Sequence, residues 1–248
     1  MRPHQSLVHS RVRVTPNYAL MPLEGFPYSR LPSWPDAQIR VLVSPAIGAK
    51  IVQYIIDLPA GKSGKFEAND EIETFFYVLS GTGAFGKGKH AIDIGAFGLI
   101  PPGEPAEFKA GEPLSLLIIQ KRYQPAAGIE PFKRLLGHEK KVKSVPWADT
   151  NKIKLQTLIP DEIQYDMAMN IFAFTPGYGL PIVETHVMEH GMLILGGKGM
   201  YKLGDDWMEV EKDDAIWIGP FCPQSFYATG DGPARYIYYK DVNRDILL

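Results

Sequence analysis

Potential metal ligands are concentrated in one short segment of the second half of the chain. Residues 184–190 read Glu-Thr-His-Val-Met-Glu-His and contain two of the six histidines, and Gln224 follows later. Neutral imidazoles, a carboxylate and an amide oxygen form a mixed nitrogen and oxygen donor set, which suits a divalent first-row metal better than calcium or magnesium. The segment therefore predicts a metal site.

The four-residue spacing of His186 and His190 is compatible with two geometries. In the first, the run fits the His-x-x-Glu-His pattern of inverted zinc peptidases, which needs a helix to bring both imidazoles to one face. Glycines and prolines at residues 176–181 and 191–199 leave a window shorter than the usual ~10 to 12 residues of a helix. The flanking residues therefore favour a strand.

On an extended strand, Glu184 and His186 point to the same side, but His190 would lie about 13 Å beyond His186 at roughly 3.3 Å per residue. One ion cannot span that distance. If all three are ligands, the chain must turn back around residues 187–189, and Gln224 would supply the ligand from a distant strand. Such a turn would swing Glu189 away from the ion, so we expect Glu189 to be an exposed turn residue.

Short strands are the elements that must position these ligands. The 21 prolines and 24 glycines divide the chain into short segments. Alternating runs predict strands in both halves. The clearest runs cover residues 49–57, 73–79, 115–120, 192–195, 214–218 and 235–240. Strands of this kind form two-sheet jelly rolls.

An internal repeat indicates two such barrels. Residues 79–85 parallel residues 195–201, and residues 100–106 parallel residues 218–224 after a small gap shift. The repeat places Ala68, Asp70, Thr74 and Ala106 opposite Glu184, His186, His190 and Gln224. None of these four is a histidine or a glutamate, so we expect the first barrel to lack a metal.

The repeat also predicts the domain organisation. We expect an N-terminal barrel over residues 1–121 and a C-terminal, metal-binding barrel over residues 162–248. A proline- and glycine-containing connector covers residues 122–161, with one helical turn near residues 131–137.

Longer segments around the ligands match a known pattern. They are residues 184–193, 217–224 and 236–244 in the second half and residues 17–26 and 80–83 in the first. These segments resemble the cupins and, more closely, the bicupin (S)-ureidoglycine aminohydrolases, over nearly the whole chain. The resemblance implies an all-β tandem cupin (bicupin) made of two double-stranded β-helix jelly-roll barrels.

The resemblance also implies a cofactor and a reaction. The cofactor is manganese, or another divalent first-row metal, held by Glu184, His186, His190 and Gln224, where the commoner cupin set is three histidines and a glutamate. The reaction is the hydrolytic release of ammonia from (S)-ureidoglycine, giving (S)-ureidoglycolate in purine and allantoin catabolism. Two other classes stay open: a different metal-cupin enzyme (dioxygenase, decarboxylase or isomerase) and a non-catalytic cupin that binds a small molecule.

The candidate catalytic residues are Glu184, Lys240, Tyr236 and Tyr201. Tyr236 and Lys240 share strand parity and either line the barrel mouth or face solvent. In the mouth, the Lys240 ammonium could pair with a substrate carboxylate, and a phenol could donate to a carbonyl. Glu184 could also move a proton.

Composition limits the possible partners. A chain with 45% hydrophobic and 22% charged residues is ordinary for a globular protein, and a net charge of −2 argues against nucleic acid. No apolar run is long enough for a membrane span. A single cysteine excludes an intrachain disulfide and fits a reducing, cytoplasmic location. We expect a small-molecule substrate, ureidoglycine, and a homo-oligomer, because cupins often assemble through sheet edges.

Overall fold

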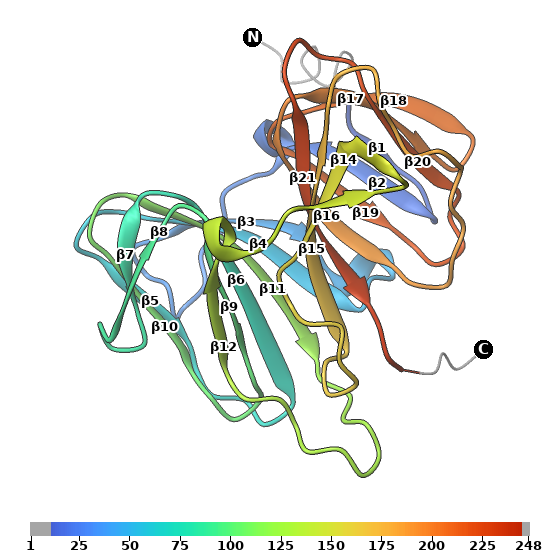
Figure 1. The fold of residues 1–248 in the computed structure, drawn as a ribbon. Coiled ribbons are helices and arrows are strands. Elements are labelled where there is room, and N and C mark those ends of the chain that lie inside the picture. The colour runs from blue at the N-terminus through green and yellow to red at the C-terminus, as the bar shows by residue number, and fades with distance from the viewer. Residues whose placement is uncertain (1–10, 245–248) are drawn as a thin grey trace, which may run out of the picture.

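The computed structural model describes residues 11–244 of the 248-residue chain. Within that range the regular elements are strands and three short 3-10 turns, η1 (Leu23–Gly25), η2 (Pro45–Ile47) and η3 (Glu139–Lys141). The strands form two barrels side by side (Figure 1). The predicted all-β tandem cupin is confirmed. The described residues form no helix that is both long and apolar enough to cross a membrane.

The first barrel pairs a six-stranded sheet with a four-stranded sheet, and all strand neighbours are antiparallel. The six-stranded sheet contains, in spatial order, β12 (Leu135–His138), β9 (Ala96–Ile100), β6 (Ile72–Ser80), β11 (Leu114–Arg122), β4 (Ile51–Leu58) and β3 (Gln38–Val43). The smaller sheet contains β5 (Ser63–Phe66), β10 (Ala106–Ala110), β7 (Thr82–Phe85) and β8 (His90–Asp93). Buried aromatic residues, including Trp34, Phe76 and Phe108, fill the space between these sheets.

The second barrel pairs an eight-stranded sheet with a three-stranded sheet. The larger sheet contains β1 (Arg13–Val14), β2 (Tyr18–Pro22), β19 (Asp214–Ile218), β16 (His190–Gly196), β21 (Ala234–Asp241), β15 (Met167–Phe174), β14 (Thr150–Thr157) and β13 (Val145–Trp147). The smaller sheet contains β18 (Asp206–Glu211), β17 (Lys198–Leu203) and β20 (Gln224–Ala228). A separate apolar cluster fills this barrel.

The large sheets of the two barrels pack back to back, and we call their contact the seam. In β6, Phe76 points into the first barrel while Phe75 enters the seam cluster. Leu193 of β16 and Ile237 of β21 enter the same cluster from the second barrel. Because these strands are buried on both faces, they are nearly continuous apolar runs.

Sheet membership does not follow the predicted boundaries. β2 lies at the start of the chain but pairs with β19 of the second barrel. The predicted connector, residues 122–161, contains β12, which pairs with β9, and β14, which pairs with β15; β12 occupies part of the expected helical turn. These strands cover sheet edges that would otherwise leave backbone groups unpaired. Residues 1–10 and 245–248 of the predicted barrels lie outside the described range.

Candidate metal centre and active site

Three backbone arrangements position the predicted metal ligands. Glu184 and Gln224, the first residue of β20, form an isolated antiparallel bridge with N–H···O distances of 2.8 and 2.9 Å. His186 follows in an irregular segment, where its carbonyl accepts a 2.7 Å hydrogen bond from Phe221 N. The chain then turns, and His190 is the first residue of β16. The predicted ligands thus come from two strands, β16 and β20, and from the segment that precedes β16.

Two imidazoles and one amide converge in the mouth of the second barrel. His186 Nε2 lies 3.2 Å from His190 Nε2 and 3.1 Å from Gln224 Nε2. The Gln224 carbonyl oxygen accepts a 3.2 Å hydrogen bond from the Tyr201 hydroxyl. Rotating the amide by half a turn would direct its oxygen toward the imidazoles and its NH2 group toward the Tyr201 oxygen, which can also accept.

The other nitrogen of each imidazole faces a backbone carbonyl. His186 Nδ1 is 3.1 Å from Met188 O, and His190 Nδ1 is 2.9 Å from Tyr239 O. A carbonyl can only accept, so each Nδ1 carries the proton and each Nε2 presents a lone pair. Two lone pairs that face each other cannot form a hydrogen bond, but they can share a cation. The residues present therefore fit a divalent metal.

Burial keeps His190 neutral. Burial lowers the pKa of the His190 imidazole to about 3, against the opposing effect of its hydrogen bond to the Tyr239 carbonyl. A metal-binding imidazole must be unprotonated, so this shift suits a ligand.

Glu184, the fourth predicted ligand, lines the same cavity as the two imidazoles but is not part of their cluster. It is half-buried, and among residues 11–244 no three His, Cys, Asp or Glu side chains are close enough together to hold an ion. The described donor cluster is thus the two imidazoles and the Gln224 amide.

Burial raises the pKa of the Tyr201 and Tyr236 phenols, and the Glu184 charge raises both further.

All predicted site residues line one cavity of about 510 Å³. They are Glu184, His186, His190, Tyr201, Gln224, Tyr236 and Lys240. Alternate residues of β21 project into this cavity, so it receives Tyr236, Tyr238 and Lys240 from one strand. Lys240 is half-buried and lies directly opposite His190 in the register of β16 and β21.

Sequence reasoning missed Asn170 as a cavity residue. Asn170 is buried on β15, lines the cavity and pairs with Tyr238 across the strands. It is also the only polar residue in the apolar run 167–174. A lone polar residue within a buried strand is a signal that could have identified it.

The prediction that Glu189 is an exposed turn residue is wrong. Its side chain has 1% relative exposure, and its carboxylate accepts hydrogen bonds from Lys50 N and from Trp217 Nε1. The turn does swing Glu189 away from the imidazoles, but into the seam rather than into solvent. Burial raises the pKa of Glu189 to about 7, although its hydrogen bonds oppose this shift.

Two antiparallel jelly-roll barrels, with a donor cluster in the mouth of one of them, define a bicupin. The solved structure of the Escherichia coli protein Ylba superposes with a TM-score of 0.86 at 30% identity, over 100% of both chains. A Bacillus subtilis oxalate decarboxylase structure, at 11% identity and a TM-score of 0.67 over 92% of this chain and 78% of that one, shares the fold. No family model matches the chain.

Curated relatives identify the particular family. The (S)-ureidoglycine aminohydrolase of Escherichia coli K12 is 34% identical over 93% of this chain and 90% of the relative. The enzyme of the same name from Arabidopsis thaliana is 30% identical over 93% of this chain and 78% of the relative. The chain belongs to the (S)-ureidoglycine aminohydrolase family.

Proposed function

We propose that this protein hydrolyses (S)-ureidoglycine to (S)-ureidoglycolate and ammonia. The observation that carries the proposal is a single cavity that combines the paired imidazoles, the Gln224 amide, the Glu184 carboxylate and the Lys240 ammonium. The names of the curated relatives support the same reaction.

His186, His190 and Gln224 would hold a divalent cation, with the Glu184 carboxylate lining the same cavity. Manganese is our first candidate, because the Bacillus subtilis oxalate decarboxylase, which shares the fold, has Mn(II) centres. Another first-row divalent metal would suit the same donors. When bound, the cation supplies positive charge that gathers the substrate's polar groups and orients the reacting carbon.

Side chains of the chain itself would bind the substrate. The Lys240 ammonium would pair with the substrate carboxylate. Tyr201 and Tyr236 are buried with raised pKa values, so both phenols stay protonated and can donate hydrogen bonds to a substrate oxygen. These contacts would fix the substrate with its reacting carbon inside the cavity.

The reaction needs one proton to move from the oxygen of water to the nitrogen of the leaving amine. Breaking the bond between the carbon and its amine releases ammonia, and a new bond forms between that carbon and the oxygen of water. The water loses a proton and the leaving amine gains one, so the step balances without a redox partner. We assign this proton transfer to Glu184, whose carboxylate lines the same cavity.

The cellular setting is also part of the proposal. We infer a cytoplasmic homo-oligomer without nucleic-acid or membrane partners. The free, buried thiol of Cys222 fits a reducing compartment. β1, β13, β8 and β18 are among the terminal strands of the described sheets, where a second copy could pair. Light scattering coupled to size-exclusion chromatography measures the number of subunits.

Ammonia release from freshly generated ureidoglycine tests the reaction. We expect Lys240→Ala and Gln224→Ala both to lose activity, with elemental analysis showing that only Gln224→Ala also loses metal. Lys202→Ala is the matched control, because Lys202 is a half-buried lysine of the same barrel that does not line the cavity. Undiminished ammonia release in both site variants would overturn the proposal, and iron or copper in the purified protein would favour a different metal-cupin reaction.

A further inference from the structure

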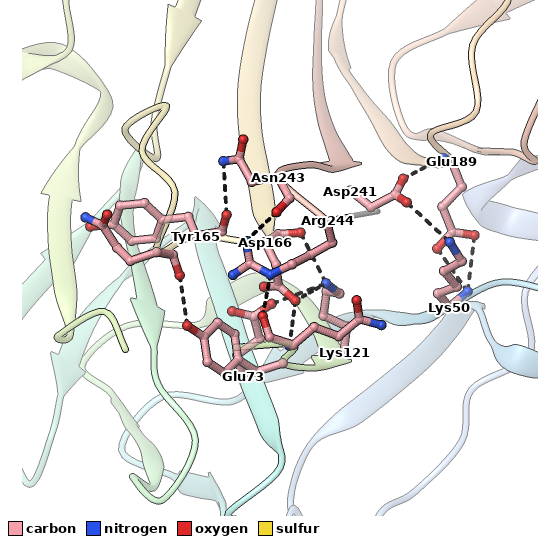
Figure 2. A network of polar contacts seen from close by, with 12 residues as sticks. Lys50, Glu73, Lys121, Tyr165, Asp166, Glu189, Asp241, Asn243 and Arg244 are labelled. Carbon is pink, nitrogen blue, oxygen red and sulfur yellow. Dashed lines mark hydrogen bonds and ion pairs between the residues drawn. The ribbon is translucent and has the colours of Figure 1, made fainter. Parts of the chain in front are cut away.

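The turn that carries His186 and His190 is attached to the first barrel through Glu189. The two carboxylate oxygens of Glu189 lie 2.9 and 3.1 Å from Lys50 N, and the second oxygen also accepts from Trp217 Nε1 at 3.2 Å. Lys50 belongs to the segment that leads into β4 of the first barrel. Figure 2 shows Glu189 and Lys50 in contact across the seam.

Asp241 completes a closed set of contacts around this point. Its Oδ1 accepts a 2.7 Å hydrogen bond from Glu189 N, and its Oδ2 lies 3.3 Å from Lys50 Nζ (Figure 2). The three residues Lys50, Glu189 and Asp241, which we call the seam clamp, thus join the first barrel to β21 and to the turn that precedes β16 in the second barrel.

The seam clamp is adjacent to the site along both strands. Glu189 immediately precedes His190, and Asp241 immediately follows Lys240. His190 and Lys240 are direct partners in the register of β16 and β21. A displacement of Glu189 would therefore shift the neighbouring His190 imidazole, and a displacement of Asp241 would shift the neighbouring Lys240 ammonium.

Regular strand pairing does not hold the turn itself. β16 begins at His190, and residues 185–189 lie outside any strand. Gln53 of β4 secures the next part of β16 by donating a 3.1 Å hydrogen bond to Met192 O. The first barrel thus contacts the chain on both sides of His190, at Glu189 in the turn and, through Gln53, at Met192 in β16.

Burying a carboxylate at a position that served only to pack two barrels together would be unfavourable in free energy. Burying a charged or polar group costs free energy unless its hydrogen bonds are made, and apolar residues of similar size often stabilise such positions equally well. The Lys50 backbone N–H and the Trp217 indole N–H both donate hydrogen bonds to the Glu189 carboxylate. These directional bonds fix its position more narrowly than apolar contacts would.

We propose that the first barrel serves as a positioning platform for the second barrel's donor cluster, and that Glu189 is its positioning residue. Glu189 holds the end of the turn against Lys50 and Trp217, and this contact sets the separation of the His186 and His190 imidazoles. This inference rests on the proposed function, because it assumes that the two imidazoles bind a cation. It assigns a role to a barrel that has no donor cluster of its own at the equivalent positions.

The affinity of the metal-free protein for Mn²⁺ tests this role without any turnover. We expect Glu189→Ala to weaken Mn²⁺ binding by about 10-fold or more, comparable with the roughly 10- to 100-fold loss when a hydrogen-bond partner of a metal ligand is removed. Glu189→Gln keeps one acceptor oxygen and is expected to recover part of the affinity. Competition with a fluorescent chelator measures both values.

Glu139→Ala is the matched control for a general loss of stability. Glu139 is also a seam carboxylate, which pairs with Arg235 and accepts from the Tyr77 hydroxyl, but it does not line the site cavity. We expect this variant to lower the thermal midpoint while leaving the Mn²⁺ affinity unchanged.

Several results would contradict the proposal that the first barrel positions the donor cluster. One is an equal loss of Mn²⁺ affinity in Glu189→Ala and Glu139→Ala, and another is an unchanged affinity in Glu189→Ala. A wild-type protein that binds no Mn²⁺ would also overturn it. A wild-type protein that binds Mn²⁺ but releases no ammonia from ureidoglycine would instead overturn the proposed function alone, since the affinities would still decide the role of Glu189.

Discussion

The two barrels share one strand register but carry different side chains at their mouths. Strand β6 pairs with β9 and β11 as β16 pairs with β19 and β21, and β10 pairs with β5 as β20 pairs with the segment at Glu184. This register places Thr74, Gln120, Ala106 and Phe66 at the positions of His190, Lys240, Gln224 and Glu184. The same backbone thus presents the predicted metal ligands and Lys240 in one barrel, and a threonine, a glutamine, an alanine and a phenylalanine in the other.

The repeat in the sequence located two of these four equivalences. Thr74 and Ala106 stand where the repeat placed them, but the residue opposite Glu184 is Phe66 rather than Ala68. Thr74 follows Phe66 by eight positions, whereas His190 follows Glu184 by six. A fixed offset between the repeats cannot detect this difference in loop length, whereas strand pairing shows it directly.

The interiors of the barrels differ as much as their mouths. In the first barrel the Trp34 ring packs against Phe66 and Phe108, with centroid distances of 5.3 and 5.8 Å. A side chain on Gly64 would collide with Trp34, since a Cβ there would lie 2.0 Å from the ring. In the second barrel the buried aromatic residues include Tyr201 and Tyr236, whose rings line a cavity. The second barrel thus combines the predicted metal ligands and the tyrosine hydroxyls with a cavity. In the first barrel, packed aromatic rings occupy the interior.

Transferring one first-barrel residue into the site should produce the largest effect. We expect His190→Thr, which copies Thr74, to abolish metal binding and to reduce ammonia release by more than the roughly 100-fold upper effect of removing an outer partner. Elemental analysis and an ammonia assay measure both. The reciprocal variant Thr74→His should gain no metal, because Phe66 and Ala106 offer no further donor; metal binding there would show that the other positions matter little.

Removing the buried Trp34 ring should affect the stability of the fold and not the reaction. Trp34 is fully buried, so Trp34→Ala is expected to reduce the free energy of unfolding by about 3–5 kcal/mol. Chemical denaturation measures this loss. Metal content should stay at the wild-type level, because Trp34 lies in the other barrel. A lower metal content at full folding would indicate that the first barrel's interior, and not only its seam, controls the site.

Lys240→Gln copies Gln120 and tests the charge at the site. A hydrogen bond to a charged group contributes ~1.5–3 kcal/mol, so we expect kcat/KM for ureidoglycine to fall by about 10- to 150-fold. Metal content should not change, since Lys240 is not a donor. Lys202→Gln, outside the cavity, should behave like the wild-type protein. Equal kinetic constants in both lysine variants would remove Lys240 from the proposed mechanism.

The features that were predictable from the sequence depend on local patterns. Strand alternation predicted that Tyr236 and Lys240 share a face, and the glycines and prolines around His186 argued correctly against a helix. Positions that depend on the seam were not predictable in this way. Glu189 is buried because Lys50 and Trp217 reach it from distant segments, and β2 joins the second barrel because β19 has a free edge. Long-range pairing of this kind leaves no periodic signal in the neighbouring residues.

The smallest expected effect concerns a second buried acid in the seam, Glu73. Lys121 Nζ lies 2.6 Å from Asp166 Oδ2 but 3.8 Å from Glu73 Oε1, and neither Glu73 oxygen has a hydrogen-bond partner among the described residues (Figure 2). Burial raises the pKa of Glu73 well above its usual range, and the Asp166 charge raises it further. The folded protein therefore retains a proton that the unfolded chain releases above about pH 4.3.

The sign of the resulting pH dependence follows from this retained proton. The contribution of Glu73 to stability is fully present below the unfolded pKa and is lost as pH rises toward the folded pKa, at up to about 1.4 kcal/mol per pH unit. Glu73→Gln mimics the protonated form, so its stability relative to wild type should increase between pH 5 and pH 6, by up to about 1.4 kcal/mol. Urea midpoints across that range measure the difference, in which titrating groups that do not interact with Glu73 cancel. Parallel curves for the two proteins would show that Glu73 is ionised in the fold, whereas diverging curves with an unchanged pH profile of ammonia release would place this acid in the supporting seam and outside the chemistry.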